Sequence, residues 1–196
     1  ASAKLKNDFD IVLAAVSEEG VALEFALDEL KNNVEIVWAA VSQTSFALEF
    51  ASAELKSNRK IVMSAVSKLG TALEDASAEL KKDRDIVLAA VSEDGLALQY
   101  ASDENKKDRG IVEAAVSTKG MALEFVSESL KSDRDIVLIA VNKCGLSLFH
   151  VIDKFNNDKE VVLTALCSKN VDEEIADEGS NYITKRYIEL ISQLGP

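Results

Sequence analysis

The sequence predicts an all-α fold: an α/α solenoid of about seven 25-residue helix–turn–helix repeats, closed by a C-terminal capping helix. Three observations predict it. A 25-residue period runs without insertion through residues 1–168, apolar residues recur within each period at helical spacing, and glycine returns near the middle of most periods. Such self-similarity is typical of repeat proteins, in which each repeat packs against its neighbours.

Two rows of equivalent residues define the period. The first is a row of β-branched residues, each followed by valine: Ile11, Ile36, Ile61, Ile86, Ile111, Ile136 and Val161. The second is a glycine row with two substitutes: Gly20, Ser45, Gly70, Gly95, Gly120, Gly145 and Asn170. This repetition lies inside one chain, so it describes the geometry of the repeat.

Each period begins with a predicted helix of about ten residues. In the fourth period Asp83 is placed to cap the free N–H groups of the first turn. The apolar residues that follow lie on one helical face: Ile86, Val87, Ala90 and Val91. Gly95 is expected to end the helix in a left-handed conformation, which residues with a Cβ resist.

A second helix is expected after the glycine, with Ala97, Leu98 and Ala101 on its inner face. Helices this short are not stable alone in water. The first helix is apolar on nearly every side, because Leu88 and Ala89 lie away from the face of Ile86. Stacking of repeats is therefore required. Trp38, which stands in the row of Leu88, is expected to fill the core; the alternative is an exposed anchor for a partner.

The ends of the chain differ from its middle. The array is assigned to residues 1–168 and starts partway through a second helix, because Ala1–Leu5 aligns with Ala51–Leu55. This start indicates an excised or processed fragment, or a piece of a longer array. Residues 169–196 lose the period and are expected to form a divergent cap with an amphipathic helix.

Composition disfavours several classes of function. The chain has 22 basic and 34 acidic residues, a net charge of −12, which makes nucleic-acid binding unlikely. No apolar run approaches the roughly 20 residues of a membrane span. Cys144 and Cys167 are expected to be free thiols, because their predicted separation is too large for a disulfide. Free thiols favour a reducing compartment.

No catalytic, cofactor-binding or metal-binding residue is predicted. His150, the single histidine, falls in a row of aromatic residues and is interpreted as a packing substitute rather than a general base. The Asp83–Asp85 and Asp133–Asp135 turns fit helix capping better than calcium binding. A row of lysines and arginines beside acidic residues predicts a paired, solvated edge. The polar residues Asn105 and Glu113 are interpreted as simple tolerance at the surface, with a specific contact or a softened joint as the alternatives.

The segments Leu80–Val91 and Gly95–Ser102 closely resemble the repeats called domain of unknown function 4116. The likeness covers about residues 1–168. It implies a helical repeat and carries over no catalytic or binding residue. The departures from the usual pattern cluster in the middle of the chain, where uniform packing is in question: Asp75, Asn105, Gly110 and Glu113.

The corner between the two helices varies most while the frame stays fixed, as in repeat proteins that present binding surfaces. Its residues are the candidate partner-binding site, although neutral drift gives the same pattern: Glu18, Glu19, Gln43, Thr44, Lys68, Leu69, Glu93, Asp94, Thr118, Lys119, Lys143 and Cys144. The sequence thus favours a non-catalytic scaffold for a protein partner, as a monomer or a structural subunit of a larger complex. The alternative is a partner-targeting segment of a larger enzyme or secreted effector.

Overall fold

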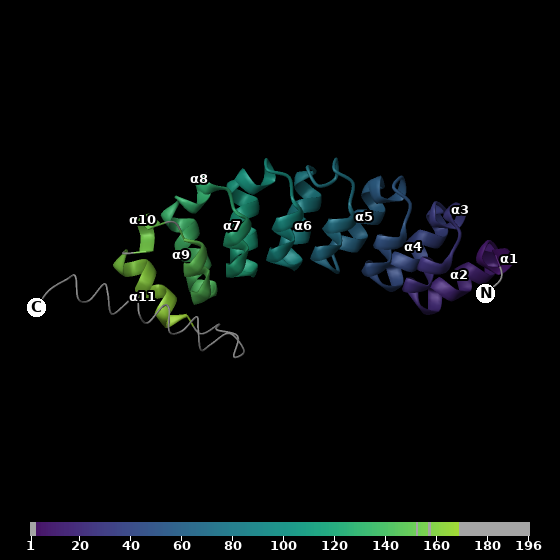
Figure 1. The fold of residues 1–196 in the computed structure, drawn as a ribbon, viewed down its shortest axis with the longest axis horizontal. Helices are drawn as coiled ribbons and strands as arrows, with labels where there is room; N and C mark the ends of the chain where they lie inside the picture. The colour runs from purple at the N-terminus through teal and green to yellow at the C-terminus, as the bar shows by residue number, and fades with distance from the viewer. Residues whose placement is uncertain (1–2, 152, 157, 169–196) are drawn as a thin grey trace, which may run out of the picture. The chain divides into compact units, whose positions relative to one another are not determined.

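The computed structural model describes residues 3–151, 153–156 and 158–168, which form helices and no strand (Figure 1). The chain divides into two compact units, Ala1–Ser102 (unit 1) and Asp103–Pro196 (unit 2). Each unit is an all-α repeat solenoid, which confirms the predicted fold class. The predicted cap at 169–196 lies outside the described residues.

The first layer of each unit is a stack of α-helices. Unit 1 contains α2 (Phe9–Glu18), α4 (Val34–Gln43), α5 (Arg59–Val66) and α6 (Arg84–Glu93); unit 2 contains α7 (Arg109–Thr118), α9 (Arg134–Lys143) and α11 (Lys159–Cys167). Within a unit, consecutive members of this layer pack side by side. The caps are as predicted: the side chains of Asp8, Asn33, Asn58 and Asp83 each accept a hydrogen bond from a backbone N–H of the first turn.

The second layer corrects the prediction of a second α-helix, because each repeat has a six-residue 3₁₀ helix there. These are η1 (Gly20–Phe25), η2 (Ser45–Phe50), η4 (Gly70–Asp75) and η5 (Gly95–Tyr100) in unit 1, and η7 (Gly120–Phe125) and η8 (Gly145–His150) in unit 2. A 3₁₀ helix closes its hydrogen bonds over three residues, so it fits a segment too short for several α-helical turns.

A short third element completes most of the repeats. These elements are α1 (Ala3–Lys6), α3 (Asp28–Lys31), η3 (Leu55–Ser57), η6 (Asn105–Lys107), α8 (Glu128–Lys131) and α10 (Asp153–Asn156). They are joined by one backbone hydrogen bond per joint, such as Ser52 N–H to the carbonyl of Lys31 at 3.0 Å and Ser77 N–H to that of Lys56 at 3.0 Å. This ladder links neighbouring repeats without using a side chain.

The core lies between the α layer and the 3₁₀ layer. Ile36, Leu48, Ile86 and Leu98 are fully buried, and Ala40 in the α layer is also 0% exposed. Isoleucine, leucine and alanine rows therefore occupy the interior as predicted. No helix among the described residues is long and apolar enough to cross a membrane.

The glycine row is explained by close approach rather than by backbone conformation. None of Gly20, Gly70, Gly120 and Gly145 has the positive φ that the predicted left-handed cap requires. A Cβ added at Gly70 would lie 2.4 Å from the carbonyl oxygen of Ala90 in the next α-helix, and the other three glycines meet the equivalent alanine at the same distance. The expectation of a left-handed glycine cap is therefore wrong at these four positions.

Ser45 stands in the glycine row and marks an irregular joint. The repeat register places it against α5, which ends at Val66, two residues earlier in the repeat than α4 ends. The N–H groups of Lys68 and Leu69 both donate to the Ala65 carbonyl, at 3.2 and 3.0 Å. The Ser45 hydroxyl is buried without a hydrogen-bond partner. We attribute the early end of α5 to the Cβ that Ser45 carries.

Substitutions at Gly70 and at Ser45 test that explanation. Gly70→Ala is expected to destabilise unit 1 by about 1–3 kcal/mol, because the new Cβ must displace backbone. Ser45→Gly is expected to stabilise the protein, because it removes a buried hydroxyl that has no hydrogen-bond partner, although glycine's flexibility offsets part of the gain. Urea unfolding followed by circular dichroism measures both. Equal midpoints for Gly70→Ala and the parent would contradict the close-approach argument.

Leu98→Ala tests burial between the layers. Leu98 is 0% exposed, so its truncation is expected to cost about 2–5 kcal/mol through lost burial and a residual cavity. Leu96→Ala is the control in the same 3₁₀ helix, because Leu96 is only partly buried. A loss at Leu98 no greater than that at Leu96 would mean that the interior is not packed as described.

Candidate interaction surfaces

The predicted corner residues lie where each α-helix passes into its 3₁₀ helix. Consecutive corners are adjacent within a unit. The Gln43 amide donates to the carbonyl of Glu18 at 3.2 Å, and its oxygen accepts from Gly20 N–H at 3.0 Å. Lys68 Nζ donates to the carbonyl of Ser42 at 3.0 Å. The first three corners of unit 1 therefore form a continuous edge.

Several corner residues take part in stacking. Asp94 caps η5 by accepting from Leu96 N–H at 3.0 Å. The side chains of Thr44 and Cys144 fill the space beside Gly20 and Gly120. The corner residues whose side chains are exposed are Glu18, Glu19, Gln43, Lys68, Glu93 and Lys119. Their charges follow no order along the edge, so a binding role for the corners stays a prediction.

Arginines at the first α-helical position bridge neighbouring repeats. Arg59 of α5 pairs with Asp83 at 2.9 Å and with Asp85 at 2.8 Å, which cap and begin the next helix. In unit 2, Arg109 pairs with Asp133, and Arg134 pairs with Asp158 at 3.0 Å and Glu160 at 2.6 Å. The predicted paired edge is therefore present at these joints.

The bridges change the acidity of the carboxyl groups that they contact. The hydrogen bond from Arg59 lowers the pKa of Asp83 below its ordinary value; backbone N–H groups act in the same direction and burial opposes them. The hydrogen bond from Arg134 lowers the pKa of Asp158 in the same way. These aspartates are partly exposed, so each bridge is screened by solvent.

Asp75 and His150 replace aromatic residues in the row of Phe25, Phe50, Tyr100 and Phe125, and each lies near a charged residue. Lys6 lies 6.0 Å from the Phe25 ring, and in the equivalent place Lys56 forms an ion pair with Asp75 at 3.3 Å. His150 is half-buried in the row, 3.9 Å from Glu124, and burial lowers its pKa. The interpretation of His150 as a packing substitute stays a prediction.

The two other polar departures have different environments. Asn105 is 5% exposed, so its interpretation as surface tolerance is wrong. It occupies the row of Leu30, Leu55 and Phe155, which are also buried. Glu113 is half-buried and pairs with Arg109 at 2.7 Å, one helical turn earlier.

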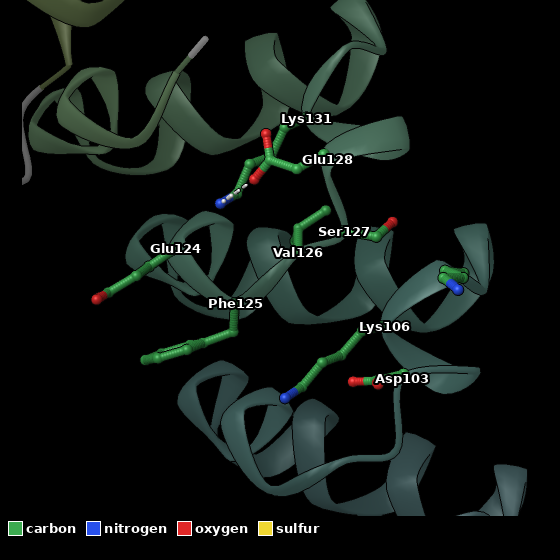
Figure 2. Close-up of a pocket in the computed structure, with 9 residues that line it drawn as sticks. Asp103, Lys106, Glu124, Phe125, Val126, Ser127, Glu128 and Lys131 are labelled. Carbon is green, nitrogen blue, oxygen red and sulfur yellow. Dashed lines mark hydrogen bonds and ion pairs between the residues drawn. The ribbon is translucent and has the colours of Figure 1, made fainter.

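Unit 2 contains a shallow polar pocket of about 360 Å³ (Figure 2). Figure 2 shows Lys106 and Phe125 reaching toward the same side of it, while Lys131 pairs with Glu128 at 3.1 Å. Its charged lining consists of three lysines and three acidic residues: Lys106, Lys107, Lys131, Asp103, Glu124 and Glu128. The balance of charge gives it no preference for an anion or a cation.

Exposed apolar side chains are concentrated in one stretch that the repeat pattern did not single out. Of eight exposed large hydrophobic residues in the described part of the chain, seven lie within residues 5–46: Leu5, Ile11, Phe25, Leu27, Val34, Trp38 and Phe46. Trp38 is 45% exposed, so the expectation that it fills the core is wrong. Its row faces away from the 3₁₀ layer, and the indole extends beyond the half-buried leucines of that row.

The reactive groups of the described residues are dispersed. Cys144 and Cys167 are both free thiols, as expected. No group of three His, Cys, Asp or Glu side chains placed to hold a metal ion occurs within the described ranges.

The bridges predict a pH dependence. Because the folded pKa of Asp83 is lowered, its stabilising effect is present above the unfolded pKa of about 3.9 and is lost as pH falls through the folded value. We expect Arg59→Val with Asp83→Asn, which copies the Val34 and Asn58 joint, to weaken the fall in urea midpoint between about pH 5 and pH 2. Midpoints measured across that range check this; parallel curves for variant and parent would contradict it.

Comparison with known proteins identifies the repeat. A family model described as domain of unknown function (DUF4116) matches residues 8–56, 58–106 and 108–155, so each match spans two 25-residue repeats. No curated protein and no solved structure matches the chain. The three tandem matches cover well over half of the chain and agree with the resemblance of the repeat phrase. The chain belongs to the DUF4116 family.

Proposed function

We propose that the chain is a non-catalytic repeat scaffold that binds another protein, alone or as a structural subunit of a larger assembly. Four of the exposed apolar residues within residues 5–46 carry this proposal: Leu27, Val34, Trp38 and Phe46. Isolated surface hydrophobics are common, but their concentration in one region of a protein is typical of an interaction surface.

The charge of the same region supports a partner with basic groups. Residues 1–58 contain four lysines, no arginine and ten acidic residues, about half of the net charge of −12. In the described part of the chain, no ion pair involves an acidic residue that precedes Asp75. A partner with basic residues around an apolar anchor would match this surface.

Trp38 and Phe46 are the strongest anchors for such a partner. Tryptophan and other aromatic residues contribute a large share of the binding energy at protein interfaces. Phe46 is 52% exposed and packs edge-on against Phe50, with ring centroids 6.0 Å apart. The two anchors lie on different elements, α4 and η2, and are therefore tested separately.

The test compares Trp38→Ala and Phe46→Ala with Leu138→Ala, which changes the Trp38-equivalent position in unit 2. Proteins retained by the immobilised full chain would be identified, purified and titrated against each variant by calorimetry. We expect Trp38→Ala or Phe46→Ala to weaken binding about tenfold or more, because anchor residues dominate interface energies. Leu138→Ala is expected to have little effect.

Folding is checked in the same variants. Trp38 and Phe46 are exposed, so their alanine variants are expected to keep the urea midpoint of the parent to within the scatter of surface substitutions. A purified protein that binds the parent and all three variants equally would contradict a site at residues 5–46. Failure of every retained protein to bind the purified chain would contradict the scaffold role.

A further inference from the structure

Helix α2 of unit 1 presents an exposed stacking face, although the equivalent face is buried in the helices that follow it in the unit. Ile11 of α2 is 46% exposed, whereas Ile36, Ile61 and Ile86 at the same repeat position are 0%, 1% and 0% exposed. Ala15 is exposed, and its equivalent Ala40 is buried. An apolar pocket of about 200 Å³ opens on this face, lined by Leu5, Ile11, Ala15, Phe25 and their neighbours.

The same face carries a pair of carboxylates whose equivalents bind arginine. Asp8 caps α2 by accepting from Ile11 N–H at 3.1 Å, and Asp10 is exposed in the first turn. These are the repeat positions of Asp83 and Asp85, which receive Arg59 of the preceding repeat. Asp133 with Asp135, and Asp158 with Glu160, receive Arg109 and Arg134. Asp8 and Asp10 form no ion pair within the described residues.

Whether a cap residue is aspartate or asparagine correlates with the residue 24 positions earlier, in the preceding repeat. Asp stands at the three caps bridged by arginine: Asp83, Asp133 and Asp158. Asn stands at Asn33 and Asn58, where the residue 24 positions earlier is Phe9 or Val34. Asparagine and aspartate cap a helix about equally well, so capping alone does not require the charge. The aspartate at Asp8 therefore indicates an arginine opposite it.

We propose that this face of α2 binds a further repeat of the same 25-residue type, whose first α-helical residue is an arginine that pairs with Asp8 and Asp10. The apolar part of the joint is the one that covers Ile36 in α4, with Ile11 and Ala15 in place of Ile36 and Ala40. The proposal concerns the stacking face of α2 and is independent of the outer surface that carries Trp38.

The test adds such a repeat to the full chain. A copy of residues 108–125 is fused directly before Ala1, because residue 126 and residue 1 occupy the same repeat position. The register then places the copied Arg109 24 residues before Asp8, the separation of Arg59 and Asp83. A second fusion carries Arg109→Val in the copy only. Asp8→Asn is introduced into both fusions and into the parent.

Hydrogen exchange of the α2 amides and the urea midpoint are the readouts. We expect both fusions to protect α2 relative to the parent, and the arginine fusion to protect it about two- to fivefold more than the valine fusion. Asp8→Asn is expected to abolish that difference and to leave the parent unchanged, because asparagine still caps α2.

Each other outcome overturns the proposal. Equal protection by the arginine and valine fusions would show that Asp8 and Asp10 do not receive arginine. No protection of α2 in either fusion would show that the face does not accept this repeat. Dimerisation of the parent that is abolished by Ile11→Asp, measured by sedimentation, would assign the face to a second copy of the chain. Trp38→Ala is the control, because it leaves this face intact.

Discussion

Four joints within the two stacks, those of Gly20, Gly70, Gly120 and Gly145, depend on a contact that leaves no room for a side chain. The glycine after one α-helix lies against the carbonyl of an alanine in the next, so the separation of neighbouring helices is fixed by backbone atoms. Helices of about ten residues gain little stability alone, and this close approach lets the isoleucine row become fully buried. The difference between Ile11 and Ile36 measures what a neighbour contributes to one position.

The joints differ in their electrostatic interactions and fall into two kinds. Those that pair Phe9 or Val34 with an asparagine cap are neutral, and those that pair Arg59, Arg109 or Arg134 with aspartate are charged. Salt and acid weaken only the second kind. The neutral joints coincide with the acidic, apolar-exposing stretch of unit 1. Glu29 and Glu54 in this stretch accept hydrogen bonds from the Asn7 and Asn32 amides, 22 residues earlier, in place of ion pairs with arginine.

The period alone predicted much of the fold, and its limits have physical causes. Alignment of repeats identified the caps such as Asp83 and the buried rows of Ile86 and Leu98, because these depend on spacing within one helix. It could not give the distance between neighbouring helices, and the reason for Gly70 was therefore misassigned. The 3₁₀ form of η5 was also missed, because α and 3₁₀ patterns differ little over six residues.

The candidate site was less predictable than the core. Corner residues such as Gln43 are exposed as expected, but the bonds from Gln43 to Gly20 and Glu18 depend on the approach of a neighbouring repeat. Trp38 was misassigned because a row shows which way a side chain points and not what lies above it. Asn105 was misassigned for the converse reason: polarity was taken as exposure, although its row turns inward at Leu55.

The backbone ladder between the short third elements restricts which residues the repeat can accept. The N–H groups of Leu27, Ser52, Ser77, Ser102 and Ser127 each donate to a lysine carbonyl of the preceding repeat. These bonds use only backbone atoms, so they require no particular side chain at the donor, but proline has no N–H to donate and would break them. The single proline of the chain is Pro196, beyond the periodic region. At these residues the ladder itself therefore excludes proline and requires no particular side chain.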